Sequence, residues 1–177
     1  MRGYFGIGVE RLSKPMNAGN LFRTAHAFGA SFVFAIDAVP AIQQASSDTS
    51  LTPKNLPFYA YDKAADLALP DECTLVGVEL LDEAIVLPAF RHPRCAAYVL
   101  GPERGSLSPA LRQRCETLVQ IPTSFCLNVA TAGAIVMYDR VLSLGRFGER
   151  PLIPGGAAEA TPPHVRGAQK VRKRVAD

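Results

Sequence analysis

The first 36 residues alternate between strand-like and helix-like patterns, and this alternation restricts the fold more than any other feature. Residues 4–10 alternate weakly, residues 17–28 carry apolar side chains at helical spacing, and residues 31–36 (SFVFAI) are aromatic and β-branched. Asn17 and Asn20 are candidate caps for the helix. A strand, a helix and a second strand in this order form a βαβ unit, which favours a parallel sheet with a right-handed crossover.

The alternation continues as far as residue 144. We expect further strands at 58–61, 74–80, 97–100 and 117–121, and further helices at 62–68, 108–114 and 128–144. Residues 38–56 are polar and irregular, and a loop of this length is usually functional or mobile. The pattern therefore predicts an α/β fold with a mostly parallel sheet flanked by helices.

Composition excludes several classes of protein. The 177 residues are 48% hydrophobic and 20% charged, which is a globular balance. No apolar run approaches the ~18 residues of a membrane span, and the N-terminus lacks a secretory signal, so we expect a cytoplasmic protein without a membrane partner. The four cysteines stand far apart, without a CxxC pair or a histidine at ligand spacing, so neither a metal site nor a disulfide framework is expected.

Charge divides the chain into two parts. Residues 1–145 carry a net charge of −1, whereas residues 146–177 carry +4. The sequence from residue 145 to residue 161 is rich in Gly, Pro and Ala, which is typical of a linker. We therefore expect one domain over residues 1–145, followed by a flexible linker and basic tail over residues 146–177. The basic excess indicates a polyanion contact, and a solvated tail is the alternative.

Three segments are candidates for a ligand site, because ligands bind beyond the carboxyl ends of strands in open α/β sheets. In residues 17–23, Arg23 lies one turn after Asn20 near a helix N-terminus, which suits a phosphate; a capped helix with a surface arginine is the alternative. Residues 100–105 and 121–128 follow apolar strands, where the backbone can approach a cofactor closely. The alternatives are an ordinary turn and an N-cap at Asn128.

Together and in this order, these segments resemble the SPOUT-class (trefoil-knot) RNA methyltransferases, in the branch that methylates the ribose 2′-hydroxyl of tRNA or rRNA. The resemblance covers residues 4–145. Two positions depart from it: Ser106 stands where the second motif has its last glycine, and Cys126 stands where the third has a serine. The matching residues are Asn17, Gly19, Asn20 and Arg23 in the first motif, Gly101 and Glu103 in the second, and Ile121, Pro122, Leu127, Asn128, Val129 and Ala130 in the third.

The resemblance implies a C-terminal deep trefoil knot that binds S-adenosylmethionine without a metal. The family assigns proton removal from the ribose hydroxyl to the first-motif arginine. Because a guanidinium seldom deprotonates, we expect Arg23 to hold an RNA phosphate and to stabilise the developing alkoxide. The implied catalytic residues are Arg23, Asn17, Glu103 and Asn128. The implied cofactor-binding residues are Val78, Glu79, Leu100, Gly101, Glu103, Ile121, Pro122, Cys126, Leu127, Asn128 and Ala130.

The resemblance also implies two partners, an RNA and a second copy of the chain. The RNA is a tRNA or an rRNA, and its expected contacts are Arg23, Arg166, Lys170, Arg172, Lys173 and Arg174. Phe22, Phe28 and the final helix offer a dimer face, and plain core is the alternative. Three other functions stay open: a base-methylating relative, an RNA- or cofactor-binding relative with little catalysis, and an oxidoreductase. The last has least support, because residues 6–11 lack the third glycine of a dinucleotide fingerprint.

Overall fold

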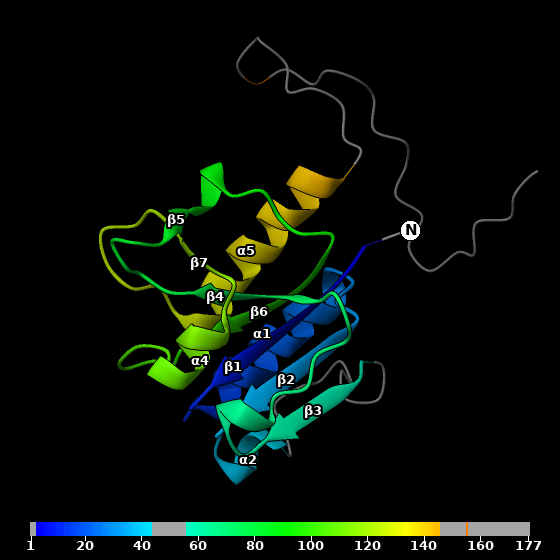
Figure 1. Cartoon of the computed structure of the whole chain (residues 1–177), viewed down its shortest axis with the longest axis vertical. Coiled ribbons are helices and arrows are strands. Elements are labelled where there is room, and N and C mark those ends of the chain that lie inside the picture. Colours follow the sequence, from blue (N-terminus) through cyan, green and yellow to red (C-terminus); the bar gives the residue numbers. More distant parts are fainter. Residues whose placement is uncertain (1–2, 44–55, 146–154, 156–177) are drawn as a thin grey trace, which may run out of the picture. The chain divides into compact units, whose positions relative to one another are not determined.

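The computed structural model describes residues 3–43, 56–145 and 155, and the described strands form one parallel sheet (Figure 1). The sheet has seven strands in the order β3-β2-β1-β6-β4-β7-β5, and every pairing is parallel. This confirms the predicted mostly parallel α/β sheet. The strands are β1 (Tyr4–Glu10), β2 (Phe32–Ile36), β3 (Phe58–Tyr61), β4 (Thr74–Val78), β5 (Ile85–Val86), β6 (Cys95–Leu100) and β7 (Thr117–Gln120).

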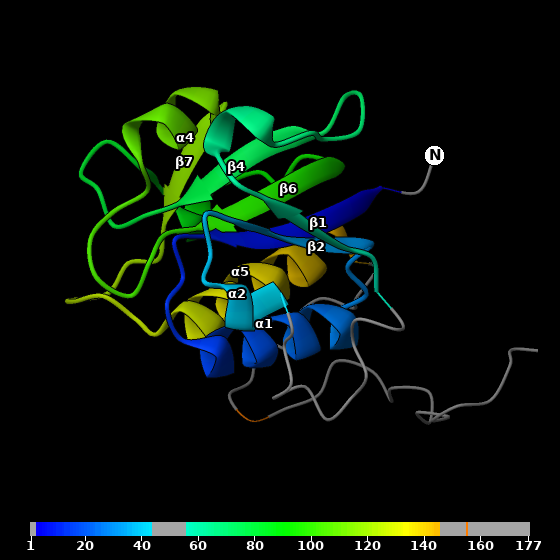
Figure 2. The same cartoon turned by 90° about the horizontal axis from the view of Figure 1, so that it is seen from below.

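Helices cover both faces of the sheet. The helices are α1 (Pro15–Ala27), α2 (Pro40–Gln43), α4 (Pro109–Arg114) and α5 (Val129–Leu144), with 3-10 turns at Ala64–Asp66 and Leu87–Ala89. Figure 2 shows α1, α2 and α5 below the sheet and α4 above it. Burial on both faces explains why the central strands are continuously apolar. In the described part of the chain, no helix is long and apolar enough to cross a membrane.

The glycines of β1 make room for the aromatic residues of β2. A Cβ atom at Gly6 would lie 2.2 Å from the Phe32 ring, and one at Gly8 would lie 2.4 Å from the Phe34 ring. Phe32 and Phe34 are buried in the core cluster on the α4 side, together with Leu107 and Leu111. The glycines are therefore a packing requirement within the strand.

Helices α1 and α5 pack closely on the opposite face. A Cβ atom at Gly133 of α5 would lie 2.2 Å from the Leu21 side chain of α1. Phe22 is 2% exposed and lies 5.6 Å from Phe58 between ring centroids, so it belongs to the core of the single chain. Of the two readings of Phe22, plain core is the one that these contacts support. Phe28 is half-buried and also packs against this core.

The amino ends of β1 and β6 are tied to α5 by Arg140, which is 4% exposed. Its guanidinium donates to the carbonyl oxygens of Pro93 (2.6 Å), Arg94 (2.6 Å) and Tyr4 (3.1 Å), and to the Tyr98 hydroxyl (3.1 Å). It also lies over the rings of Phe5 and Tyr98. This buried network holds the amino ends of β1 and β6 against α5.

Several predicted boundaries were wrong. Residues 62–68 form only a single 3-10 turn, because Leu67 is the one buried side chain there and a short helix needs more packing to nucleate. The strand predicted over 74–80 ends at Val78. Residues 40–43, within the predicted loop 38–56, form α2, and residues 44–55 lie outside the described residues. The two-residue strand β5 was missed because so short an element carries no periodicity.

The predicted caps of α1 were also wrong. Helix α1 begins with Pro15, and its cap residue Lys14 makes no side-chain cap hydrogen bond. Asn17 lies within the first turn, and its side chain bonds to other segments instead. The cap predicted for α5 is confirmed, since the Asn128 side chain accepts a hydrogen bond from the amide of Ala130 at 2.9 Å.

Candidate active site

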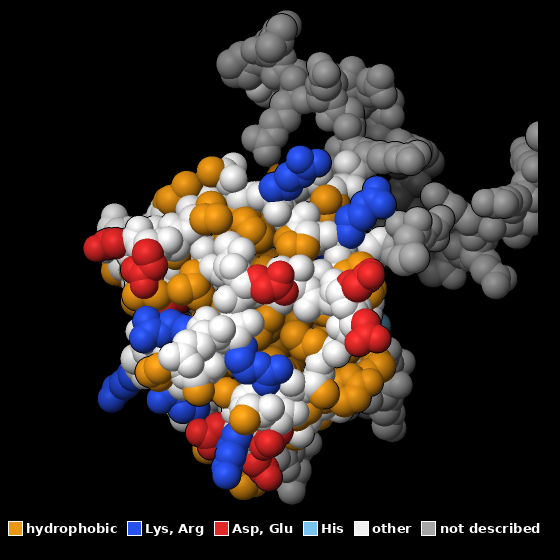
Figure 3. All heavy atoms as spheres, viewed as in Figure 1, with side chains coloured by type: hydrophobic (Ala, Val, Ile, Leu, Met, Phe, Trp, Pro, Cys, Tyr) orange, Lys and Arg blue, Asp and Glu red, His pale blue; other side chains and the backbone are white. Residues whose placement is uncertain are grey.

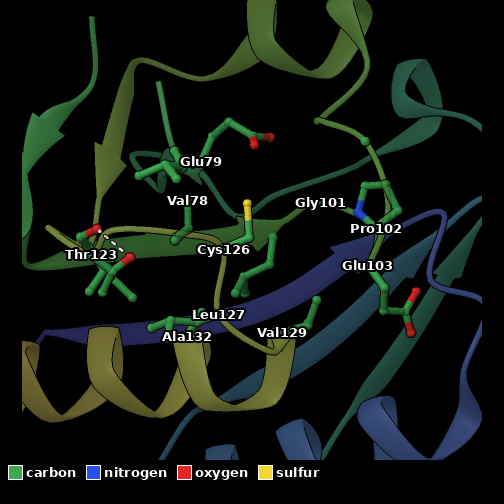
Figure 4. A pocket seen from close by; sticks show the side chains of 14 residues that line it. Val78, Glu79, Gly101, Pro102, Glu103, Thr123, Cys126, Leu127, Val129 and Ala132 are labelled. Carbon is green, nitrogen blue, oxygen red and sulfur yellow. Dashed lines mark hydrogen bonds between the residues drawn. The ribbon is translucent and has the colours of Figure 1, made fainter. Parts of the chain in front are cut away.

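A pocket of about 710 Å³, including its open mouth, lies beyond the carboxyl ends of β4, β6 and β7 (Figure 4). In Figure 4, Val78 and Glu79 form one side and Leu127, Val129 and Ala132 form the other. Three loops, which follow three different strands, therefore converge on one cavity. The lining residues are Val78, Glu79, Leu80, Leu100, Gly101, Pro102, Glu103, Gly105, Ile121, Thr123, Cys126, Leu127, Val129 and Ala132.

Gly101 lines the pocket and lies close to both Glu79 and Leu107. A Cβ atom at this position would lie 3.2 Å from the amide nitrogen of Leu107 and 3.3 Å from Oε2 of Glu79. The same Glu79 oxygen accepts a hydrogen bond from the Leu107 amide at 2.7 Å, which joins the end of β4 to the β6–α4 loop. A side chain at residue 101 would press on the hydrogen bond between Glu79 and Leu107. Glycine at this position therefore lets the two segments stay close together beside the pocket.

Glu103 joins the second motif to the beginning of α1. Its carboxylate accepts hydrogen bonds from the Ser13 amide (3.3 Å), the Ser13 hydroxyl (3.2 Å), the Lys14 amide (3.2 Å) and the Asn17 side chain (3.0 Å). Partial burial by itself raises the pKa of the Glu103 carboxyl, but hydrogen bonds from its own backbone, Asn17 and Ser13 outweigh burial and lower this pKa. The carboxylate is therefore held ionised, with its oxygens directed at α1.

The two asparagines extend this connection to the third motif. Asn128 donates from Nδ2 to Oδ1 of Asn17 at 3.1 Å, while its own Oδ1 caps α5. Asn17 in turn donates to Glu103, so Glu103, Asn17 and Asn128 form one hydrogen-bonded chain across three loops. The partners of each amide determine which of its ends is oxygen and which is nitrogen. The chain fixes the relative positions of the three motifs around the pocket.

Glu10 and Arg11, at the end of β1, contact the β6–α4 loop and the beginning of α4. Glu10 is 2% exposed and accepts a hydrogen bond from the Ser108 amide at 2.6 Å. Arg11 has a positive φ of 53° and donates from its guanidinium to the carbonyl oxygen of Ser106. These contacts connect the β1–α1 loop to the β6–α4 loop a second time, independently of Glu103.

The predicted cofactor-binding residues divide into two groups. Val78, Glu79, Leu100, Gly101, Glu103, Ile121, Cys126 and Leu127 line the pocket, whereas Pro122, Asn128 and Ala130 are adjacent in sequence to lining residues but do not line it. Sequence reasoning missed Leu80, Pro102, Gly105, Thr123, Val129 and Ala132. Pro102, Gly105 and Thr123 lie within the candidate segments 100–105 and 121–128, Val129 is a third-motif residue, Leu80 follows the predicted Glu79, and Ala132 lies one helical turn after Asn128.

Arg23 lies away from this pocket in the single chain. It is exposed on α1, six residues after Asn17, which corresponds to about 9 Å along the helix axis. Arg23 is absent from the residues that line the pocket. The tail residues Arg166, Lys170, Arg172, Lys173 and Arg174 lie outside the described residues.

All four cysteines are free thiols, and Cys126 is the exposed one. Within residues 3–43 and 56–145, no group of three or more His, Cys, Asp or Glu side chains is arranged to hold a metal ion. The described residues around the pocket thus offer a cavity with apolar walls, two carboxylates and several backbone groups.

Known proteins are similar to this chain in sequence or in fold. A curated mouse (Mus musculus) protein, tRNA (guanosine(18)-2'-O)-methyltransferase TARBP1, is 26% identical in an alignment 148 residues long that covers 75% of this chain and 9% of that protein. The AdoMet-bound rRNA methyltransferase from Sinorhizobium meliloti has a TM-score of 0.71 and 20% identity, over 81% of this chain and 58% of its own. A solved structure that concerns the 2-OH methylation of C/U34 on tRNA has a TM-score of 0.68 and 23% identity, over 82% of this chain and 100% of its own.

The two structural similarities agree with the resemblance found in the sequence motifs, and their TM-scores establish the fold. Beyond this, residues 5–138 match the model of the SpoU rRNA Methylase family, and this range contains all three motifs. The chain therefore belongs to the SpoU rRNA Methylase family.

Proposed function

We propose that the protein is an S-adenosylmethionine-dependent RNA methyltransferase that modifies a ribose 2′-hydroxyl in tRNA or rRNA. The observation that carries this proposal is the convergence of the loops after β4, β6 and β7 on one pocket at the carboxyl edge of the sheet, because the last two of these loops carry the second and third motifs. Family membership supports it, and so do the names of the similar proteins, which describe methyl transfer to RNA.

The residues around the pocket fit S-adenosylmethionine. Val78, Leu100, Ile121 and Leu127 give apolar walls suited to an adenine ring and a thioether chain. The absence of a side chain at Gly101 allows close approach to the backbone beside the Glu79 carboxylate. When bound, this cofactor supplies a methyl group that its sulfonium already activates, so the protein's part is binding and alignment.

Glu103, Asn17 and Asn128 act as positioning residues in this proposal. The described hydrogen bonds already commit the Glu103 carboxylate to four donors and both ends of each asparagine amide to partners. These side chains keep the loops in register, which preserves the alignment on which methyl transfer depends. We therefore propose a positioning role for Glu103, Asn17 and Asn128, in place of the catalytic role that the family resemblance implied.

Arg23 is proposed to complete the site across a homodimer. In the single chain it lies outside the pocket. In the proposed homodimer, Arg23 of the partner subunit would approach the same mouth. The exposed apolar side chains of α5, Ile135, Tyr138 and Leu144, support such a pairing. There Arg23 would hold an RNA phosphate and stabilise the charge on the ribose oxygen.

Three further expectations stay predictions. The C-terminal trefoil knot, the cytoplasmic location and the RNA contacts of the tail rest on the family resemblance or on composition. The tail is tested by removing residues 161–177 and measuring RNA affinity against salt, because each lost phosphate contact lowers the slope of log K against log salt by roughly 0.7 to 0.9. An unchanged slope would make the tail a solvated end.

The proposal is tested by incubating the protein with methyl-labelled S-adenosylmethionine and unmodified tRNA or rRNA. Nucleoside mass spectrometry of the product is expected to find a 2′-O-methylated ribose. Arg23→Ala is expected to lower kcat strongly, while Arg91→Ala, an exposed arginine near the amino edge of the sheet, is expected to leave it unchanged. Normal turnover by the Arg23→Ala variant would remove Arg23 from the mechanism.

The alternative of an RNA- or cofactor-binding relative with little catalysis rests on Ser106 and Cys126, the two departures from the family's motifs. Of these, Cys126 lines the pocket. In that case the protein would bind S-adenosylmethionine and RNA without transferring label, and Cys126→Ser would be the variant to examine for recovered turnover. A methylated base in the product would instead identify the base-methylating alternative.

A further inference from the structure

Two large apolar side chains stand out from the surface beside the pocket. Phe125 is 75% exposed and Met16 is 69% exposed, which are the two highest values among large hydrophobic residues in the described part of the chain. Phe125 directly precedes Cys126 of the pocket lining, and Met16 directly precedes Asn17. The hydrogen bond between Asn17 and Asn128 joins their two segments.

The loop that carries Phe125 is held in place by its own hydrogen bonds. The Thr123 hydroxyl donates to the carbonyl oxygen of Phe125 at 2.9 Å, and the cap at Asn128 anchors the other end of the loop. Thr123 and Cys126 line the pocket, whereas Phe125 does not and stays exposed to solvent. An aromatic ring exposed on an anchored loop presents a flat apolar face to whatever approaches the pocket.

The surroundings of this ring are cationic. Arg11, Lys14 and Arg104 are exposed on the two loops that Glu103 joins. Arg11 pairs with the buried Glu10 at 3.8 Å but keeps a 43% exposed side chain, and Glu103 keeps its charge among four neutral donors. Three exposed cations therefore stand against one buried and one half-buried carboxylate. Figure 3 shows blue Lys and Arg side chains at the lower left of this face, with red Asp and Glu side chains among them.

We propose that Phe125 is a stacking platform for an unpaired base next to the nucleotide that enters the pocket, and that Arg11, Lys14 and Arg104 hold the flanking phosphates. The inference rests on the proposed function and specifies its substrate as a single-stranded loop of RNA. Every base presents a π-face to an aromatic ring, and cations beside that ring match the phosphate backbone. Met16 provides an adaptable apolar contact at the same mouth.

The sequence contains no tryptophan, so Phe125→Trp introduces a single fluorescent reporter at the platform. Adding an unmodified tRNA transcript is expected to quench its emission, since a stacked base contacts the indole. The matched control is Tyr59→Trp, which places the reporter at a 49% exposed position on edge strand β3. Its emission is expected to stay constant. Unchanged emission from Phe125→Trp with saturating RNA would overturn the proposal.

Substitutions that remove the ring test its contribution to affinity. Phe125→Ala is expected to raise the Kd for the tRNA transcript about tenfold, without changing the affinity for S-adenosylmethionine. Phe125→Tyr is expected to restore RNA affinity, whereas Phe125→Leu is not. Full rescue by leucine would show a generic apolar contact and contradict stacking. Emission from Phe125→Trp that changes with protein concentration and then does not respond to RNA would identify a second copy of the chain as the occupant of this ring and would also contradict it.

Failure of this inference and failure of the proposed function give different results. Methyl transfer by the wild-type protein, combined with no quenching and no loss of affinity in Phe125→Ala, would leave the function standing and remove the platform. Quenching by RNA without any methyl transfer would keep the platform and reject the enzyme.

Discussion

The two edges of the sheet each depend on one charged side chain that serves several backbone groups, but they do so in opposite ways. At the amino edge, Arg140 is 4% exposed and donates to three carbonyl oxygens and one hydroxyl. At the carboxyl edge, Glu103 is partly exposed and accepts from two backbone amides and two side chains. The charged side chain at the amino edge is buried, whereas the one at the carboxyl edge lines an open pocket.

The comparison separates the residues that hold the fold from those that hold the site. A buried cation whose partners are all neutral is costly to remove, because the carbonyl oxygens around it lose their donors in a place that water does not reach. A carboxylate beside solvent contributes less to stability, because water replaces its partners more easily. The main role of this carboxylate is to position the loops around the pocket.

The largest expected effect is that of Arg140→Met on stability. We expect the free energy of unfolding to fall by about 3 kcal/mol, since several buried acceptors lose their donor. Urea denaturation measures this change, and calorimetry below the unfolding transition should find normal affinity for S-adenosylmethionine. Arg91→Met removes an exposed arginine and is expected to change stability by less than about 0.5 kcal/mol. Equal effects of the two variants would refute the distinction between buried and exposed arginines.

Glu103→Gln should affect the site more than the fold. We expect the free energy of unfolding to fall by about 1–2 kcal/mol, because the four donors lose a charged acceptor. The rate of methyl transfer is expected to fall by more than this loss of stability explains. Since the folded pKa of Glu103 is lowered, its contribution to stability is present above pH 4.5 and is lost as the pH falls through the folded value. Denaturation curves of wild type and variant should therefore converge in acid. The control is Glu83→Gln at an exposed carboxylate, and curves that stay parallel would count against the assignment.

His92 gives the amino edge its own pH dependence. Arg140 donates to the Tyr98 hydroxyl, so that hydroxyl donates to Nδ1 of His92 at 2.6 Å, and Nε2–H of His92 donates to Asp139 at 2.9 Å. Burial lowers the pKa of His92, although Asp139 opposes this.

Below about pH 6.5 the unfolded chain therefore takes up a proton that the folded protein resists, and stability falls with the pH. His92→Gln is expected to flatten this slope in denaturation curves measured across that pH range. His26→Gln, at an exposed position on α1, is expected to keep it. Identical slopes for both variants would exclude His92 as the source.

The smallest expected effect separates two roles of Asn128. Asn128→Asp keeps the acceptor that caps α5 but loses the donor to Asn17, whereas Asn128→Ala loses both. We expect the alanine variant to be about 1 kcal/mol less stable than the aspartate variant, because only alanine removes the cap. Both should slow methyl transfer similarly if the bond to Asn17 aligns the loops. Normal turnover by the aspartate variant would confine Asn128 to capping.

Much of the fold and two of the loops around the pocket follow from local patterns, whereas the individual pocket residues were implied by the family resemblance. The apolar strands specify a parallel sheet, and a parallel sheet brings the loops around Gly101 and Ile121 to the same edge. The spacing of Asn20 and Arg23 shows that they share a helix face, but not where that face points, so the distance of Arg23 from the pocket was not predictable.

Buried charge escaped prediction for a related reason. Arg140 and His92 are residue types that usually lie at the surface, and only long-range packing reveals their carbonyl and hydroxyl partners. In the same way, Asn17 resembles a helix cap in the sequence because Glu103, 86 residues further along the chain, is not visible as its partner.

The central claim is that the pocket around Gly101 binds S-adenosylmethionine. Calorimetric titration of wild type and Gly101→Val tests it most directly, because the valine side chain would press on the Leu107 amide and the Glu79 carboxylate. We predict one cofactor per wild-type chain and an affinity about 100-fold weaker in the variant, which corresponds to about 3 kcal/mol of crowding. Equal affinity in a folded Gly101→Val protein would contradict the account.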